Sequence, residues 1–151
     1  MPTSQELDAR VAAYYASRFG VPASVLSELR MESKNEEIWA TTGGPLAGIR
    51  SVRSMGLRIG RAFPQGFKPT SVFLCALGTH IVRARVPVDR DQLTQLLLGR
   101  RLSWDDPDEG YVALDHAGDV LGCGRIHRGH LQALIPTGRR RELLEILSAA
   151  S

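Results

Sequence analysis

The spacing of hydrophobic positions predicts helices at the two ends of the first half of the chain and strands between them. Apolar residues recur at helical spacing over Leu7–Tyr15, and Gly20 follows as a typical C-terminal stop. A short second helix is expected after Pro22, and a third over Ser71–Leu77, with Thr70 as its N-terminal cap. The strands expected between them are Ile38–Thr41, Ile49–Val52 and Gly56–Phe63.

The second half of the chain is dominated by predicted strands. Residues His80–Val86 alternate along the chain, which is the period-two pattern of a half-buried strand. A helix should follow, because Asp89 or Asp91 can cap a stripe of leucines that Gly99 ends. The remaining predicted elements are a hairpin of Gly110–Asp115 and Val120–Ile126, a strand over His130–Ile135, and a helix that begins at Thr137 or Gly138 and reaches Leu147.

Together these elements indicate the α+β class, with a small N-terminal α+β half over residues 1–78 and a second half over residues 79–151. The 151 residues are 43% hydrophobic and 23% charged, as in an average soluble globular protein. No apolar run approaches the ~18 residues of a membrane span, and the polar N-terminus lacks a signal-peptide pattern. Cys75 and Cys123 cannot build a disulfide framework, so we expect a cytoplasmic location and no membrane partner.

Basic residues are distributed unevenly along the chain. The formal net charge is +3, yet residues 49–86 hold seven basic groups and no acid, whereas residues 87–119 hold three basic groups and eight acids. Such blocks predict a polarised surface, with a basic patch of the kind that binds a polyanion. Only Lys34 and Lys68 are lysines, and arginine suits RNA because it contacts phosphate in a bidentate way and stacks on bases. A GC-rich genome would also favour arginine, but it does not account for the acid-free block.

The motifs of the second half follow a specific order. The strand His80–Val86 leads to a helix that ends in the passage Gln95–Leu102, which contains Gly99-Arg100-Arg101. The paired strands Gly110–Leu114 and Val120–Ile126 come next, and the second of them carries a Gly-x-Gly beside an arginine. This order resembles the PUA domain, a small pseudo-barrel RNA-binding module that opens with a helix, a glycine and a short strand.

The neighbouring segments extend the resemblance. Leu131–Arg141 is similar to the tail found on PUA-like segments at the C-terminus of Sun/Fmu-type rRNA cytosine methyltransferases. Ile59–Arg61, Lys68–Ser71 and the short helix after them resemble the pre-PUA half of that group, and small ribosome-biogenesis PUA proteins have the same two-part layout. The resemblance covers about residues 36–147. It implies a pre-PUA α+β half followed by a PUA-like mixed β pseudo-barrel with flanking helices.

The resemblance implies a non-catalytic RNA-binding protein, an adaptor in rRNA maturation, ribosome biogenesis or RNA modification, which works without a cofactor. The methyltransferase itself needs a doubly wound domain and a cysteine that follows proline, and neither Cys75 nor Cys123 does so. The expected partners are structured RNA, such as rRNA or tRNA, and an RNA methyltransferase or pre-ribosomal proteins. The alternative is a protein–protein recruitment module without RNA affinity, which uses the acidic residues 87–119 beside an RNA-modifying enzyme.

Residues for other chemistries are present, but their spacing favours structural roles. Cys123, His127 and His130 are zinc-type ligands, yet positions 123 and 127 of an extended strand lie ~13 Å apart, too far for one coordination sphere. No glycine-rich segment has the context of a nucleotide-binding loop. We therefore expect neither a metal site nor a catalytic site. A small enzyme that uses His116 and the acidic loop Trp104–Glu109 is the third alternative, although these residues lack a hydrolase context.

The expected RNA surface is a set of arginines near one glycine loop. As the resemblance implies, RNA contacts the helix–glycine–strand passage and the closing strands, which here are Gly99-Arg100-Arg101 and residues 125–141. Three adjacent arginines at the start of the last helix oppose the positive end of its dipole, and a bound phosphate would relieve that conflict. The full predicted set, in which Arg83 and Arg85 form an exposed edge, is Arg83, Arg85, Arg100, Arg101, Arg125, Arg128, Arg139, Arg140 and Arg141.

Overall fold

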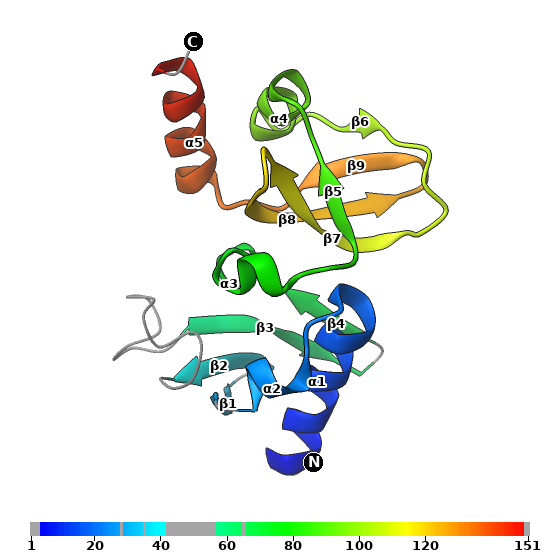
Figure 1. The fold of residues 1–151 in the computed structure, drawn as a ribbon, viewed down its shortest axis with the longest axis vertical. Helices are drawn as coiled ribbons and strands as arrows, with labels where there is room; N and C mark the ends of the chain where they lie inside the picture. The colour runs from blue at the N-terminus through cyan, green and yellow to red at the C-terminus, as the bar shows by residue number, and fades with distance from the viewer. Residues whose placement is uncertain (1–3, 28, 35, 42–56, 65, 150–151) are drawn as a thin grey trace.

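The computed structural model describes residues 4–27, 29–34, 36–41, 57–64 and 66–149, which form two sheets with helices between and around them (Figure 1). The elements of the first half are α1 (Ser4–Phe19), α2 (Ala23–Leu26), β1 (Arg30–Lys34), β2 (Glu37–Thr41), β3 (Leu57–Phe63), β4 (Gly66–Pro69) and α3 (Ser71–Leu77). The elements of the second half are η3 (Gly78–His80), β5 (Arg85–Pro87), α4 (Arg90–Leu97), β6 (Leu102–Ser103), β7 (Gly110–His116), β8 (Asp119–His127), β9 (His130–Ala133) and α5 (Thr137–Ala149).

An aromatic cluster fastens α1 to the N-terminal sheet, whose strands run in the order β1-β2-β3-β4 with antiparallel neighbours. Tyr15 and Phe19 lie four residues apart, so their rings share one face of α1, 5.8 Å between centroids. The Tyr15 ring also contacts Phe67 of β4 and Phe73 of α3, at 5.6 and 5.2 Å. Its buried hydroxyl donates a hydrogen bond of 2.6 Å to the Ile59 carbonyl, which fixes the helix against β3.

The second sheet is a curled mixed sheet with the order β5-β7-β8-β9-β6, in which the β5–β7 pair is parallel. Its inner face packs on the leucine stripe of α4, formed by Leu93, Leu96 and Leu97, and Leu143 of α5 joins the same core. The side chain of Asp89 caps α4 by accepting from the Gln92 amide at 2.8 Å. The predicted α+β fold, with a PUA-like curled sheet and flanking helices in its second half, is confirmed.

Helix α3 lies between the two sheets (Figure 1). The Ser71 hydroxyl at its start donates to the Leu134 carbonyl at 3.0 Å and accepts from the Cys123 amide at 2.9 Å. Ala113 of β7 and Cys123 of β8 are buried in the hydrophobic core of the first half, so that core extends onto the second sheet. The predicted domain boundary between residues 78 and 79 follows the C-terminus of α3 in the sequence, and it stays a prediction.

The described residues depart from the predicted elements in two respects: β1 and β4 were not predicted, and the strand expected over His80–Val86 begins only at Arg85. Instead of a strand over His80–Val86, a 3-10 turn and an irregular stretch lead to β5, because the amides of Val82 and Arg83 both donate to the Phe19 carbonyl. Ala84 then adopts a positive φ of 51°, which no alternation pattern signals. The predicted strand Ile49–Val52 lies outside the described residues. None of the described helices is long and apolar enough to cross a membrane.

Candidate nucleic-acid interface

The N-terminal turn of α5 lies against the glycine turn that ends α4. Gly99 has a φ of +86°, and a Cβ placed on it would lie 3.2 Å from Nη1 of Arg140. Nη2 of Arg140 donates to the Thr137 hydroxyl at 3.1 Å, which holds the guanidinium back over the start of its own helix. Nε of Arg140 is buried, and no hydrogen-bond partner for it exists among the described residues. Two of the predicted segments, 99–101 and 139–141, therefore meet through Arg140.

The other arginines of these two segments are exposed. Arg139 forms an ion pair of 3.0 Å with Glu142 one turn further along α5, and Arg100 donates to the Gln95 side chain. For Arg101 and Arg141, the described residues provide no side-chain partner. A helix start with three cations and a single compensating acid is electrostatically unfavourable without an anion. We call Arg100, Arg101, Arg139, Arg140 and Arg141 the α5 arginine cluster.

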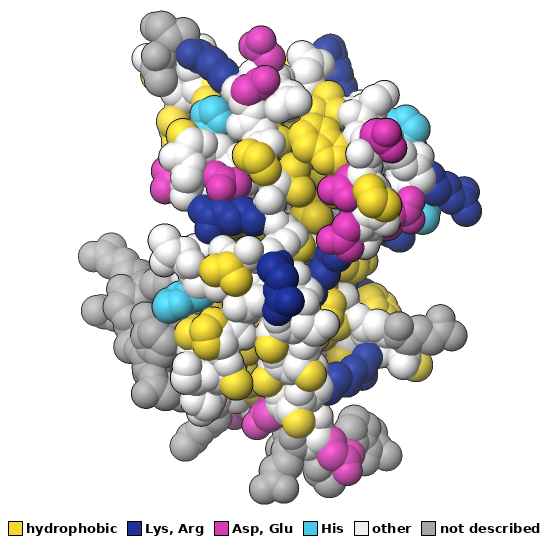
Figure 2. Space-filling model, turned by 45° about the vertical axis from the view of Figure 1, so that its right-hand side comes forward, with side chains coloured by type: hydrophobic (Ala, Val, Ile, Leu, Met, Phe, Trp, Pro, Cys, Tyr) yellow, Lys and Arg dark blue, Asp and Glu magenta, His cyan; other side chains and the backbone are white. Residues whose placement is uncertain are grey.

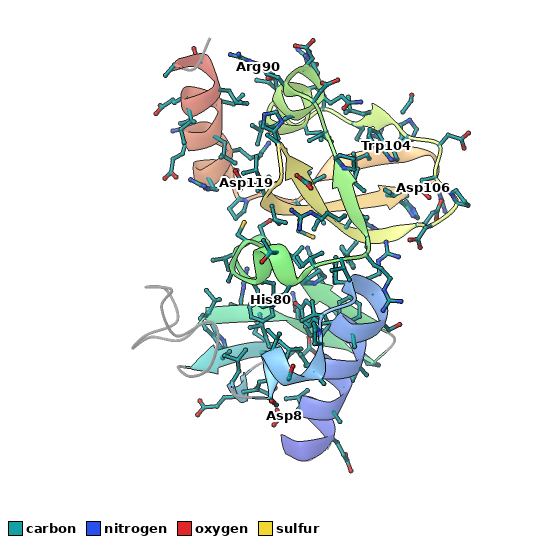
Figure 3. All side chains as sticks on the ribbon, in the orientation of Figure 1. Asp8, His80, Arg90, Trp104, Asp106 and Asp119 are labelled. Atoms are coloured by element: carbon teal, nitrogen blue, oxygen red, sulfur yellow. The ribbon has the colours of Figure 1, made fainter. Side chains whose placement is uncertain are left out.

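Arg125 and Arg128 belong to a different end of the second sheet. The Arg125 guanidinium lies over the Tyr111 ring, 5.9 Å from its centroid. Arg128 occupies the turn between β8 and β9 with a φ of 49°, and its amide donates to the Glu109 carboxylate at 2.8 Å. Figure 3 shows Asp106 of the acidic loop at this end of the sheet and Asp119 at the opposite end, beside α5. The predicted arginines thus form two groups rather than one patch.

The expected exposure holds for Arg83 but is wrong for Arg85. The Arg83 side chain is exposed, with Nη2 donating to the Ala16 carbonyl at 2.6 Å. The Arg85 side chain is only 20% exposed and forms an ion pair of 2.7 Å with Asp115. Nη1 also donates to the carbonyls of Gly78 and Ile81, and Nη2 donates to the carbonyl of Gly118. Alternation failed here because β5 has only three residues and the Arg85 side chain binds carbonyls of the preceding turn and of Gly118.

The residues considered for metal or acid–base chemistry lie in structural positions. Cys123 is buried, and burial raises the pKa of its thiol to about 12, whereas His127 and His130 are exposed. The described residues contain no group of three potential ligands that could hold a metal ion. His116 contacts the Val88 carbonyl through Nδ1 at 3.0 Å. In the acidic loop, Asp108 is ion-paired with Arg18 at 2.7 Å.

No site residues were predicted on one further basic surface, although the acid-free block of residues 49–86 indicated it. Arg58, Arg61 and Lys68 line a hollow of about 260 Å³ that the N-terminal sheet shares with Leu134 and Pro136, and Glu37, paired with Arg58 at 2.9 Å, is the acid in its lining. Arg61 and Lys68 stand directly opposite each other on β3 and β4, a like-charge pair that disfavours the sheet. Because Pro136 directly precedes α5, this hollow lies next to the start of that helix.

Residues 83–141 match the family described as the methyltransferase RsmF PUA domain. This chain carries a PUA domain. The match runs from just before β5 to the first turn of α5, so it includes both the Gly99 turn and Arg139–Arg141. A PUA domain is an RNA-binding module that has no catalytic activity of its own, and this domain is of the kind appended to Sun/Fmu-type methyltransferases. Comparison with curated proteins gives no match.

Proposed function

We propose that this protein is a non-catalytic RNA-binding adaptor that acts in the cytoplasm, in rRNA maturation or beside an RNA-modifying enzyme. The observation that carries the proposal is the α5 arginine cluster, which lies at the glycine turn of a PUA domain. Structured RNA, such as rRNA or tRNA, is the proposed ligand, and an RNA methyltransferase or pre-ribosomal proteins are the proposed protein partners. The division into residues 1–78 and 79–151 is part of the same proposal.

Phosphate contacts account for the affinity in this proposal. The exposed guanidinium groups of Arg101 and Arg141 are available for bidentate contacts, and the free amides of the first turn of α5 would add donors for a phosphate. Arg100, Arg139 and Arg140 complete this contact region, and Arg125, Arg128 and Arg83 are proposed as outer contacts. Arg85 is excluded because its side chain is largely buried and protein oxygens accept from four of its five N–H groups. RNA shape and 2′-hydroxyl groups, rather than a long sequence, would then be recognised.

The test is a filter-binding titration of tRNA and of a transcribed rRNA hairpin over a range of salt concentrations. Log affinity should fall linearly with log salt, and replacing Arg139, Arg140 and Arg141 by alanine should reduce that slope by up to ~3. Arg90→Ala is a matched control, because Arg90 is an exposed arginine at the other end of α4 that donates to the Leu147 carbonyl. Figure 3 shows it between α4 and the far end of α5.

Two outcomes would contradict the proposal. Weak, salt-independent binding of every structured RNA would exclude an RNA-binding function. Capture of the same protein partner from nuclease-treated and from untreated lysate would indicate recruitment through residues 87–119 instead. An unchanged slope in the triple variant would leave RNA binding intact but move the contact region to the hollow lined by Arg58, Arg61 and Lys68.

A further inference from the structure

A second concave surface lies where the two halves of the molecule meet, away from α5. It is a hollow of about 560 Å³ lined by Phe63, Pro64, Gly66, Phe67 and Tyr111, and thus by the β3–β4 hairpin on one side and the start of β7 on the other. Its volume is within the range of roughly 300–1,000 Å³ that small-molecule sites occupy. Figure 2 shows hydrophobic side chains between the two halves on this side, with basic side chains next to them.

Two rings of this hollow, Phe63 and Tyr111, lie outside the cluster of ring contacts in the first half, and Tyr111 packs against that core from the side. Tyr14, Tyr15, Phe19, Phe67 and Phe73 form a connected cluster of ring contacts in the first half. Within the described part of the chain, the half-buried rings of Phe63 and Tyr111 take no part in that cluster. Each instead lies under a guanidinium: Arg61 is 5.3 Å from the Phe63 centroid and Arg125 is 5.9 Å from the Tyr111 centroid. An aromatic ring stacked with arginine at a hollow is a common way to hold a nucleobase.

Both walls of the hollow are held in place by hydrogen bonds. Arg18 donates through Nε to the Tyr111 carbonyl at 2.7 Å, and the ion pair between Arg18 and Asp108 braces the same strand. On the opposite wall, Arg10 donates to the carbonyls of Phe63 and Gly66, at either end of the hairpin turn. The rings are therefore presented in a fixed arrangement before any ligand arrives, which lowers the entropy cost of binding.

The charges around the hollow favour an anionic chain over a neutral one. Arg10, Arg18, Arg61 and Arg125 surround it. Asp108 is paired with Arg18 and Glu36 with Arg61, at 3.4 Å, and Glu37 stands opposite Arg61 on β2. Arg10 and Arg125 have no acidic partner among the described residues. An aromatic floor with cations at its rim matches a nucleotide, whose base is apolar on its faces and whose phosphate is negative.

We propose that this hollow binds an unpaired base of the RNA, stacked on Tyr111 and held between the two halves, with Arg125 on its phosphate side. The proposal rests on the RNA-binding function proposed above and adds a second contact to it. It also gives Arg125 a role that separates it from the α5 arginine cluster, since Arg125 and Tyr111 stand opposite each other on β8 and β7. The first half of the molecule contributes Phe63, so the site needs both halves.

The experiment compares two probes of equal charge, a ten-nucleotide oligoadenylate and a ten-unit abasic ribose-phosphate chain. The parent protein should bind the oligoadenylate about tenfold more tightly, because stacking of one base on an aromatic ring contributes that order of affinity. In Tyr111→Leu the preference should disappear, and in Tyr111→Phe it should remain. Moving a single 2-aminopurine along the oligoadenylate should reveal one or two positions whose fluorescence is quenched by the parent protein but not by Tyr111→Leu.

Further variants separate this site from the α5 arginine cluster and from misfolding. The Arg139, Arg140 and Arg141 triple variant should bind both probes more weakly and keep the tenfold preference. Phe63→Leu, on the opposite wall, should lose the preference as Tyr111→Leu does. The site can therefore still be tested if one of these two variants fails to fold. Equal binding of the two probes by the parent, with a normal salt slope for structured RNA, would overturn the base site alone. If the parent protein bound neither the two probes nor structured RNA, the proposed function would be overturned as well.

Discussion

The guanidinium of Arg140 lies over Gly99, with Nη1 3.2 Å from the position that a Cβ on Gly99 would occupy. Residues far apart in the sequence are brought together here because α5 packs on α4 through Leu143. The contact places a glycine of the α4 turn and an arginine of α5 in one candidate region. The glycine supplies both a backbone conformation that L side chains avoid and the open space into which the guanidinium fits.

Gly99→Ala is therefore expected to affect both stability and RNA binding. The φ of +86° costs a residue with a Cβ about 1–3 kcal/mol, and Arg140 must shift to make room. The free energy of unfolding from urea titration should fall by that amount, and RNA affinity should fall with it. Gly138→Ala is the control, because its Cβ would meet no heavy atom within 4 Å and its φ is not positive. Equal stability of the two variants would contradict this account of the turn.

Local sequence patterns predicted the elements of this site, whereas long-range contacts determined how they meet. The leucine spacing of α4 and α5 and the turn between β7 and β8 gave those elements correctly, since each depends on neighbouring residues. The separation of Arg125 from Arg140 was not predictable, because it depends on which end of the curled sheet each strand residue occupies. Likewise, the stretch before β5 is shaped by the Phe19 carbonyl, a partner far away in the sequence.

Arg85→Ala is expected to lower stability without weakening RNA binding. The ion pair with Asp115 is 2.7 Å long and largely shielded from solvent, and three further hydrogen bonds would be lost with it. Hydrogen bonds to charged groups contribute about 1.5–3 kcal/mol each in such settings, so the free energy of unfolding should fall by at least about 1.5 kcal/mol.

Arg101→Ala provides the opposite case to Arg85→Ala. Its side chain is exposed and has no partner among the described residues, so its loss should leave the urea midpoint unchanged and reduce the salt slope of RNA binding by about 1. The pair of variants should thus separate a structural arginine from a binding arginine. A fully stable Arg85→Ala protein with a reduced salt slope would place Arg85 on the RNA surface after all.

Gly60→Ala should disrupt the packing that supports the aromatic hollow. A Cβ at this position would lie 2.1 Å from Cζ of Phe67 and 2.7 Å from the Lys68 carbonyl oxygen, so both the ring and the backbone of β4 would have to move. Overpacking of this kind costs about 1–3 kcal/mol, measurable as a lower urea midpoint. Gly66→Ala, on the same hairpin, meets nothing within 4 Å and should keep the parent midpoint. Matching midpoints for the two variants would show that β4 tolerates the displacement.

Stability should decline at alkaline pH because buried thiol and phenol groups lose their protons more readily once the chain unfolds. Burial raises the pKa of the Cys123 thiol from 9.0 to about 12, and burial also raises the pKa of Tyr14 and Tyr15 above 10. Above pH 9 the unfolded thiol loses a proton that the folded thiol keeps, so its contribution is present below pH 9 and is lost between about pH 9 and 12, at up to ~1.4 kcal/mol per pH unit. Urea midpoints at pH 8, 9 and 10 should therefore fall in the parent protein. They should fall less steeply in Cys123→Ala, which lacks the thiol but keeps both tyrosines, and identical slopes would show that Cys123 does not carry this part of the pH dependence.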